Sequence, residues 1–476
     1  MSDMATNNVS MSDDGTEATP QTISQKFYRA AWRWHFYAGL YVIPFLLVLA
    51  ITGLIMVYFN SIETRFGEKL YIAPKAEMLL PTAQQRAVAN AYPGSFITQY
   101  MPPPAADRTS LFTIKVDGEK TIVSVDPYTA EIVGAVKKDS TWFYFASDIH
   151  GSLLIGDLGD RLLEIAAGLT IVLIATGLYL WWPRNGKGLK DALFPDLSGK
   201  GRNIWKELHV SIGFYISIVL FFFLISGLSW AGIWGGKFVQ PWSTFPAEKW
   251  DNVPLSDQYH GMMNDGAVKE VPWGLELTKM PMSGSDAGTI GIPEGYAINL
   301  NSIIVLAHGI GFNKQFRVNL PGSPTGVYTI SADSMDGDTE TPTSDKTVHV
   351  DQYTGKILGE VGYEDYSLMA KSMAVGIALH QGDMGWWNTI LNTLFCLAVI
   401  FLCISGIVMW WIRRPKGAGR LVAPPLPKNL PLWKGAVFIM LLLSLAFPLV
   451  GLTLLGVLAI DLLILSQLPF MKRAFN

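Results

Sequence analysis

In the stretch "AWRWHFYAGLYVIPFLLVLAITGLIMVYF", residues 31–59, His35 stands at the start of an apolar run long enough to cross a bilayer. A second stretch, "NIWKELHVSIGFYISIVLFFFLISGLSW", residues 203–230, repeats this arrangement around His209. Half of the 476 residues are hydrophobic. The sequence therefore predicts a membrane protein, and its formal charge of -3 gives no indication of nucleic-acid binding.

Four segments have the length and apolar character of membrane crossings. A fifth block, residues 432–469, is close to twice the length that one crossing needs. It is predicted to form a helical hairpin broken near Pro448 and Gly451, with one long kinked helix as the alternative. The four single crossings are residues 34–59, 158–182, 210–234 and 387–412.

Basic residues predict the orientation of these segments. Residues 183–206 hold six Lys or Arg against two Asp, and residues 413–434 hold six with no acid. Both loops are therefore expected in the cytoplasm, together with both termini. Residues 239–370 hold seven basic and 17 acidic residues, which places them on the opposite side.

The two halves of the sequence resemble each other. "VDPYTAEIVG" at residues 125–134 recurs as "VDQYTGKILG" at residues 350–359, each with the alternation of a strand, a turn and a strand. "HGSLLIGDLG" after the first of these pieces has a counterpart in "HQGDMG" after the second. The helices that follow end in "TGLYLWWPR" and "SGIVMWWIRRP". The repeat predicts a unit of helix, exported α+β insert and helix that occurs twice.

The "WRWH" and "WKELH" helix starts, the paired strands and the Trp-Trp ends together make the chain similar to the PepSY-associated transmembrane family. Known relatives are inner-membrane proteins of iron acquisition, some of them haem-containing reductases of ferric siderophores. The resemblance implies a membrane α-helical bundle with two extracytoplasmic α+β (PepSY-like) inserts, an internally duplicated helix–insert–helix unit and a C-terminal helical hairpin. The expected parts are a disordered tail (1–24), helix 1 (25–59), insert 1 (60–147), helix 2 (148–183), a loop (184–203), helix 3 (204–235), insert 2 (236–370), helix 4 (371–412), a loop (413–431) and the hairpin (432–470).

The histidines support a haem site independently. Helices 1 and 3 run outward, so His35 and His209 are expected at the inner ends. Helices 2 and 4 run inward, so His150 and His380 are expected at the outer ends. Each depth-matched pair is predicted to ligate the iron of one haem b, which needs axial nitrogen ligands.

Glycines on the same helix faces would leave bare backbone beside a flat macrocycle. Charged side chains would neutralise haem propionates: Arg33, Lys206 and Arg29 at the inner site, and Arg161 at the outer site. The glycines expected to line the two sites are Gly39, Gly53, Gly177, Gly213, Gly227 and Gly406.

Plainer roles stay open for all these groups. A histidine at a helix end is often an interfacial residue, and glycines also permit close helix packing in bilayers. Arg33 and Lys206 fit ordinary positive-inside residues, and Arg161 is equally able to pair with Asp157, Asp160 or Glu164.

Three further histidines, His260, His308 and His349, lie in the second insert and are expected to be ordinary surface or core residues. The alternative is a soft-metal site around "YHGMM", residues 259–263, with Met280 and Met282 beyond it, because thioethers and imidazoles suit copper.

The predicted function is a di-haem electron conduit that reduces a ferric complex, with a ferric siderophore as the expected partner. No Gly-x-Gly-x-x-Gly loop follows a strand, so quinol or a separate reductase is expected to donate the electrons. The lipid bilayer is the remaining partner. The alternatives are a transporter, and a periplasmic binding or regulatory module of iron or copper homeostasis without redox activity.

Overall fold

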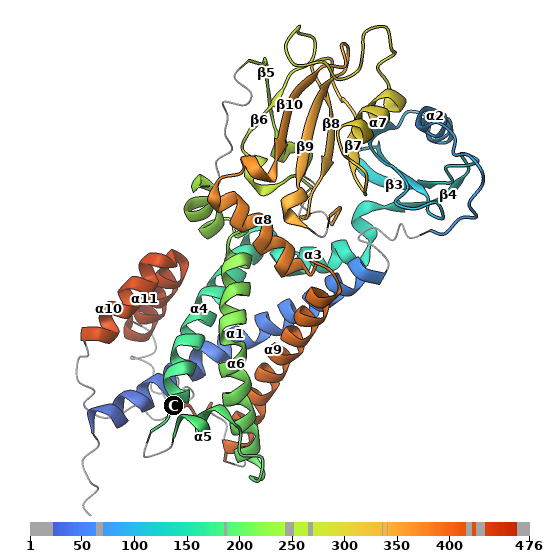
Figure 1. Ribbon diagram of the computed structural model, residues 1–476. Coiled ribbons are helices and arrows are strands. Elements are labelled where there is room, and N and C mark those ends of the chain that lie inside the picture. Colours follow the sequence, from blue (N-terminus) through green and yellow to red (C-terminus); the bar gives the residue numbers. More distant parts are fainter. Residues whose placement is uncertain are drawn as a thin grey trace, which may run out of the picture.

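A helical bundle carries a β-sheet domain at one end (Figure 1). The computed structural model describes residues 22–62, 70–184, 188–242, 252–264, 270–335, 337–339, 341–415, 421–424 and 434–463. The predicted tail lies almost wholly outside these residues, as do parts of the loops 184–203 and 413–431.

Four long helices form the bundle, and each is long and apolar enough to cross a membrane. Their sequences are near-continuous apolar runs, as expected where lipid surrounds a helix and every backbone group must be satisfied within it. Buried side chains such as Ala50, Leu224 and Phe395 pack the four helices together. The helices are α1 (Ile23–Ile62), α4 (Asp157–Trp181), α6 (Arg202–Leu228) and α9 (Trp386–Arg413).

Two shorter helices lie between the bundle and the sheet, and they correct the predicted bounds of helices 2 and 4. His150 lies on α3 (Trp142–Ser152) and His380 on α8 (Leu368–Gln381), both separate from the spanning helices. Residues with a positive φ separate each short helix from the spanning helix that follows it. Leu153 and Leu154 follow α3, and Gly382 and Gly385 follow α8. Such conformations end an α-helix, so each apolar segment turns before it enters the bundle.

The two inserts form one sheet rather than two separate domains. The strand order is β10-β9-β8-β7-β1-β2-β3-β4, and every neighbouring pair is antiparallel. Strands β1 and β7 lie at the centre of this sheet and join the halves, with Tyr100 opposite Val318. Each would be an edge strand if the two inserts formed separate sheets, so their pairing satisfies backbone groups that two isolated sheets would leave unpaired. The strands are β1 (Phe96–Met101), β2 (Ser110–Val116), β3 (Glu119–Val125), β4 (Ile132–Lys137), β7 (Arg317–Asn319), β8 (Val327–Ala332), β9 (Lys346–Asp351) and β10 (Ile357–Gly362).

One face of the sheet is apolar along most of its width. Helices α2 (Pro81–Ala91) and α7 (Leu300–Gly309) contribute Val88 and Ile303 to this core, which also contains Phe112 and Ile330 from the strands. The alternation of side chains along each strand sends the neighbouring residues to the other face.

The other face differs between the two halves. In the first half, Met101 and Leu111 pack on Phe143 of α3. In the second half the face carries buried polar residues and is covered by the chain around the small two-stranded sheet of β5 (Leu255–Tyr259) and β6 (Lys279–Pro281). The polar residues are Arg317, Thr329, Ser331, Thr347 and His349.

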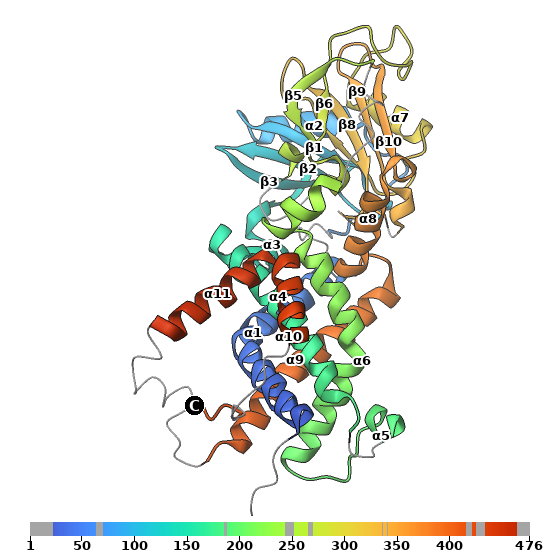
Figure 2. The same cartoon turned by 90° about the vertical axis from the view of Figure 1, so that its left-hand side faces the viewer.

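Near the C-terminal end of the described chain, two apolar helices pack beside α1 and α4 (Figure 2). Helix α10 (Lys434–Ala446) and helix α11 (Pro448–Leu463) are separated at Phe447. The Trp234 indole N–H donates to the Ala446 carbonyl over 2.9 Å, so this break lies level with the end of α6 that faces the sheet. A short helix, α5 (Leu189–Leu193), precedes α6.

Candidate functional site

Two pairs of histidines face each other across the bundle, and both are the pairs expected from the sequence. His35 on α1 and His209 on α6 have ring centres 6.5 Å apart with an interplanar angle of 82°. We call them the sheet-distal pair. His150 and His380, the sheet-proximal pair, have ring centres 6.3 Å apart at 90°. All four residues are half-buried, so protein atoms leave part of each side chain uncovered.

Each of the four imidazoles is held through Nδ1 by a serine or threonine hydroxyl of a spanning helix. The hydroxyl always comes from a different helix than the histidine. The four contacts are His35 to Thr176 at 3.0 Å, His150 to Thr52 at 2.9 Å, His209 to Ser405 at 2.7 Å and His380 to Ser226 at 2.7 Å.

The hydroxyl groups also fix the tautomer. Each hydroxyl is within hydrogen-bond distance of a backbone carbonyl of its own helix: Val172, Val48, Leu402 and Phe222. A hydroxyl has one hydrogen, so donating it to the carbonyl leaves the oxygen to accept from the imidazole Nδ1–H. The proton therefore resides on Nδ1, and Nε2 of each ring carries a free lone pair.

Nε2 is thus the nitrogen available to a metal. Histidine ligands of metals commonly donate their second ring N–H to a protein group in this way. Imidazole nitrogens lie about 2.0–2.1 Å from such a metal, so two rings on opposite sides of one ion have centres about 6.3 Å apart. The two observed separations, 6.5 Å and 6.3 Å, match that spacing. The residues therefore fit two haem irons, each with two axial imidazoles.

Four of the predicted glycines lie beside imidazoles of the two pairs. A Cβ on Gly177 would lie 3.2 Å from His35 Cε1, and one on Gly53 would lie 3.8 Å from His150 Cε1. The corresponding distances are 3.7 Å for Gly227 to His380 and 3.9 Å for Gly406 to His209. These glycines admit a histidine ring from another helix rather than only leaving bare backbone for a macrocycle.

The other two predicted glycines contact neighbouring helices. A Cβ on Gly39 would lie 4.0 Å from Leu173 Cδ2, and one on Gly213 would lie 3.8 Å from Leu402 Cδ2. Both distances are ordinary van der Waals contacts. Close helix packing, the plainer role considered for these glycines, accounts for both positions.

The charged residues near the pairs have protein partners. Arg33 donates to the Pro424 carbonyl over 2.7 Å, and Lys206 lies 3.4 Å from Glu207. Arg161 is paired with Asp160, and its Nη1 lies 3.9 Å from Glu164. For Arg161 the plainer alternative therefore describes the structure.

Sequence reasoning missed the four hydroxyl residues. Each directly precedes one of the predicted glycines, in "ITGL" (51–54), "ATGL" (175–178), "ISGL" (225–228) and "ISGI" (404–407). This recurring hydroxyl–glycine dipeptide is the signal that would have found them.

A third histidine pair lies in the sheet domain, where the sequence analysis expected ordinary residues. His260 Nε2 and His349 Nε2 are 2.8 Å apart, and both side chains are fully buried. His260 Nδ1–H donates to the Thr278 carbonyl over 2.7 Å, and His349 Nδ1 lies 2.9 Å from Thr329 Oγ1. Burial lowers the pKa of His260 to about 4 and that of His349 well below its usual value, so both rings are neutral near pH 7.

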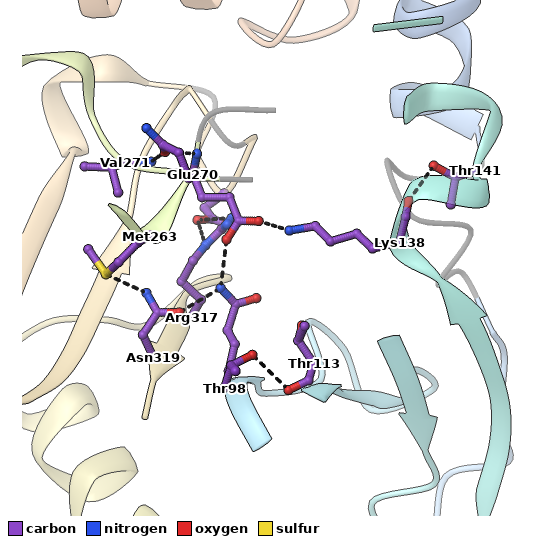
Figure 3. A network of polar contacts seen from close by, with 12 residues as sticks. Thr98, Thr113, Lys138, Thr141, Met263, Glu270, Val271, Arg317 and Asn319 are labelled. Atoms are coloured by element: carbon purple, nitrogen blue, oxygen red, sulfur yellow. Dashed lines mark hydrogen bonds and ion pairs between the residues drawn. The ribbon is translucent and has the colours of Figure 1, made fainter. Parts of the chain in front are cut away.

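Next to this pair, a buried ion pair joins the two halves of the sheet domain (Figure 3). Lys138, at the start of the segment that leads into α3, contacts Glu270 of the second insert. Gln99 of β1 donates to Glu270 over 3.3 Å and to Asn319 of β7 over 2.9 Å. His308, by contrast, is exposed.

These features define a multi-pass membrane protein whose helices hold two facing imidazole pairs. The chain belongs to the family of the PepSY-associated TM region, whose family model matches residues 32–413. This match confirms the family predicted from the sequence. The comparison with curated proteins gave no significant match.

Proposed function

We propose that the protein is a di-haem electron conduit of the bacterial inner membrane that reduces a ferric complex, such as a ferric siderophore, on the side of the sheet domain. The observation that carries this proposal is the geometry of the two pairs. Both have the ring spacing of two imidazoles on one metal ion, and they lie at opposite ends of the bundle.

In this proposal the histidines bind the haems and the hydroxyl groups orient the histidine rings. His35 and His209 would hold one haem b, and His150 and His380 the other, through Nε2. The four hydroxyl groups orient the rings and keep the proton on Nδ1, which makes each Nε2 a better donor. When bound, each haem supplies a one-electron redox couple.

The charge distribution supports the direction of transfer. The described parts of the basic loops 183–206 and 413–434 lie at the end of the bundle away from the sheet, and the basic residues of these loops favour a cytoplasmic location for that end and for both termini. The sheet domain would then be periplasmic, and the sheet-proximal pair would be the outer one. Quinol or a separate reductase would donate electrons to the conduit.

The first test is the visible spectrum of purified protein produced with haem available. We expect two b-type haems per chain by pyridine haemochrome assay, with a sharpened α-band on reduction by dithionite. A colourless, well-folded preparation would overturn the proposal.

The second test measures electron transfer itself. Protein reconstituted in vesicles that enclose a reductant should reduce an external ferric hydroxamate complex, detected with a chelator specific for ferrous iron. Vesicles with the His35→Ala variant are the matched control. If they reduce the complex as fast as wild-type vesicles, the histidine pairs do not form the path.

A further inference from the structure

The buried histidine pair of the sheet domain adjoins a small cavity on the polar face of the sheet. The cavity has a volume of about 10 Å³, close to the space that one water molecule or ion occupies. His260, Met263 and Glu270 line it from the covering segment, and Asn319 and Thr347 line it from the strands. His349 lies two residues beyond Thr347 on β9, and therefore on the same face of the sheet.

One side chain at this cavity is left without a partner. The Thr347 hydroxyl is buried, with the residue 2 % exposed, and forms no hydrogen bond with any described residue. Buried hydroxyl groups are normally satisfied. The Thr347 hydroxyl therefore adds a polar group to the wall of the cavity, beside the imidazole and thioether groups.

The groups around the cavity are soft or neutral. The Met263 thioether lies 3.7 Å from the Asn319 amide nitrogen, a contact visible in Figure 3. The carboxylate of Glu270, the hard ligand of the set, is already engaged by Lys138 and Gln99. Imidazole and thioether ligands without a free carboxylate favour Cu⁺ over harder ions.

We propose that His260, His349 and Met263 form a buried binding site for one Cu⁺ ion. The three ligands would be Nε2 of His260, Nε2 of His349 and Sδ of Met263. This site is separate from the four histidines of the bundle and does not depend on the proposed redox function.

Proton positions in the pair allow the ion to bind without a change in protonation. His260 donates through Nδ1 to a carbonyl, so its Nε2 carries a lone pair. In the metal-free pair, His349 Nε2–H donates to that lone pair across the 2.8 Å contact. On binding, the His349 proton moves to Nδ1 and is donated to Thr329 Oγ1, so both Nε2 lone pairs reach the ion and the oxidation state of copper stays the same.

Binding also requires a small movement. Two metal–nitrogen bonds of about 2.0 Å need nitrogen atoms about 3.5–4 Å apart, so the two nitrogen atoms, now 2.8 Å apart, must separate by about 0.7–1.2 Å. His349 is fixed within the sheet on β9, whereas His260 lies in the short turn that follows β5. The movement is therefore expected in the covering segment.

The test is equilibrium dialysis of the full-length protein against a buffered Cu⁺ solution without oxygen, followed by metal analysis. We expect one Cu⁺ per chain for the wild type and none for His260→Gln or His349→Gln. Met263→Leu should weaken binding at least tenfold. Two matched controls should bind as the wild type does: Met262→Leu, at an exposed neighbouring methionine, and His308→Ala, at an exposed histidine of the same domain.

X-ray absorption at the copper edge gives a second measurement that does not depend on folding of the histidine variants. The wild type should show two nitrogen ligands and one sulfur ligand, and Met263→Leu should lose the sulfur. The proposal is overturned if the wild type binds no Cu⁺, if both histidine variants still bind it, or if the domain takes up Zn²⁺ and not Cu⁺. Haem content, measured separately, reports on the proposed function alone.

Discussion

The histidine pairs of the bundle and the pair of the sheet domain have similar Nδ1 contacts but different distances between ring centres. In each pair the rings are held by Nδ1 contacts, to hydroxyls in the bundle and to a carbonyl and a hydroxyl in the sheet domain. The ring centres are 6.5 Å and 6.3 Å apart in the bundle but 4.9 Å apart in the sheet domain.

This difference separates two kinds of site. The bundle pairs have the ring spacing of two imidazoles on one metal ion, whereas the two rings of the sheet pair are within hydrogen-bond distance of each other. The packing of the helices sets the first spacing, and the contact between β9 and the segment that follows β5 sets the second. Variants of either kind of pair test this difference.

The largest expected effect comes from removing a histidine of the bundle. His380→Ala should lose about half of the bound haem, because one axial ligand of one site disappears. His260→Gln should keep the full amount. The haem content per chain of both variants is measured by pyridine haemochrome assay. Equal loss of haem in the two variants would contradict the assignment of haem binding to the bundle pairs alone.

The second effect concerns the buried ion pair that joins the two halves of the sheet domain. Lys138→Met should lower the free energy of unfolding by about 3–5 kcal/mol, because it leaves the buried Glu270 carboxylate without its partner. Lys137→Met is the matched control, since the neighbouring Lys137–Glu119 pair has both side chains 59 % exposed. Thermal unfolding measures both variants.

For the control we expect no measurable change in Tm, because exposed ion pairs contribute little. If the Lys138 and Lys137 variants unfold alike, Lys138–Glu270 does not hold the sheet domain together.

A smaller effect is expected from the hydroxyl groups. Ser226→Ala should weaken haem retention at the sheet-proximal pair about 10- to 100-fold, because His380 loses the acceptor for Nδ1–H. Ser217→Ala, on the same helix, is the control, since the Ser217 hydroxyl donates to the Phe214 carbonyl. Haem transfer to an excess of apo-myoglobin gives the rates. Equal rates for the two variants would show that the hydroxyl does not support the ligand.

The smallest effect is a pH dependence confined to the sheet domain. Burial, with the charge of Asp333 next, raises the pKa of Asp345 to about 8. Between pH 3.8 and 8 the native state holds a proton that the unfolded chain releases, so stability falls as pH rises through this window.

Asp345→Asn removes that penalty and still accepts from the Ser334 N–H. Its Tm should exceed that of the wild type by about 2–4 °C at pH 9 and match it near pH 4. A difference of equal size at both pH values would assign the effect to packing and not to ionisation.

Much of the site could be predicted from the sequence because helical spacing is local. The positions of His35 and Gly39 on one face follow from 3.6 residues per turn, and the direction of each helix predicts which histidines share a depth. The duplication itself stays a prediction. The break after His150 was missed because left-handed leucines at 153 and 154 carry no strong sequence signal. The break after His380 was missed although Gly382 and Gly385, which favour such a conformation, follow it directly.

The family, the membrane-spanning segments and the pairing of four histidines follow from the amino-acid sequence, because sequence motifs, hydropathy and helical periodicity are properties of neighbouring residues. Three features depend on the folded chain: which hydroxyl contacts each imidazole, the pairing of β1 with β7 that joins the inserts into one sheet, and the contact between His260 and His349. These contacts join residues far apart in the chain, and their geometry depends on how the elements pack.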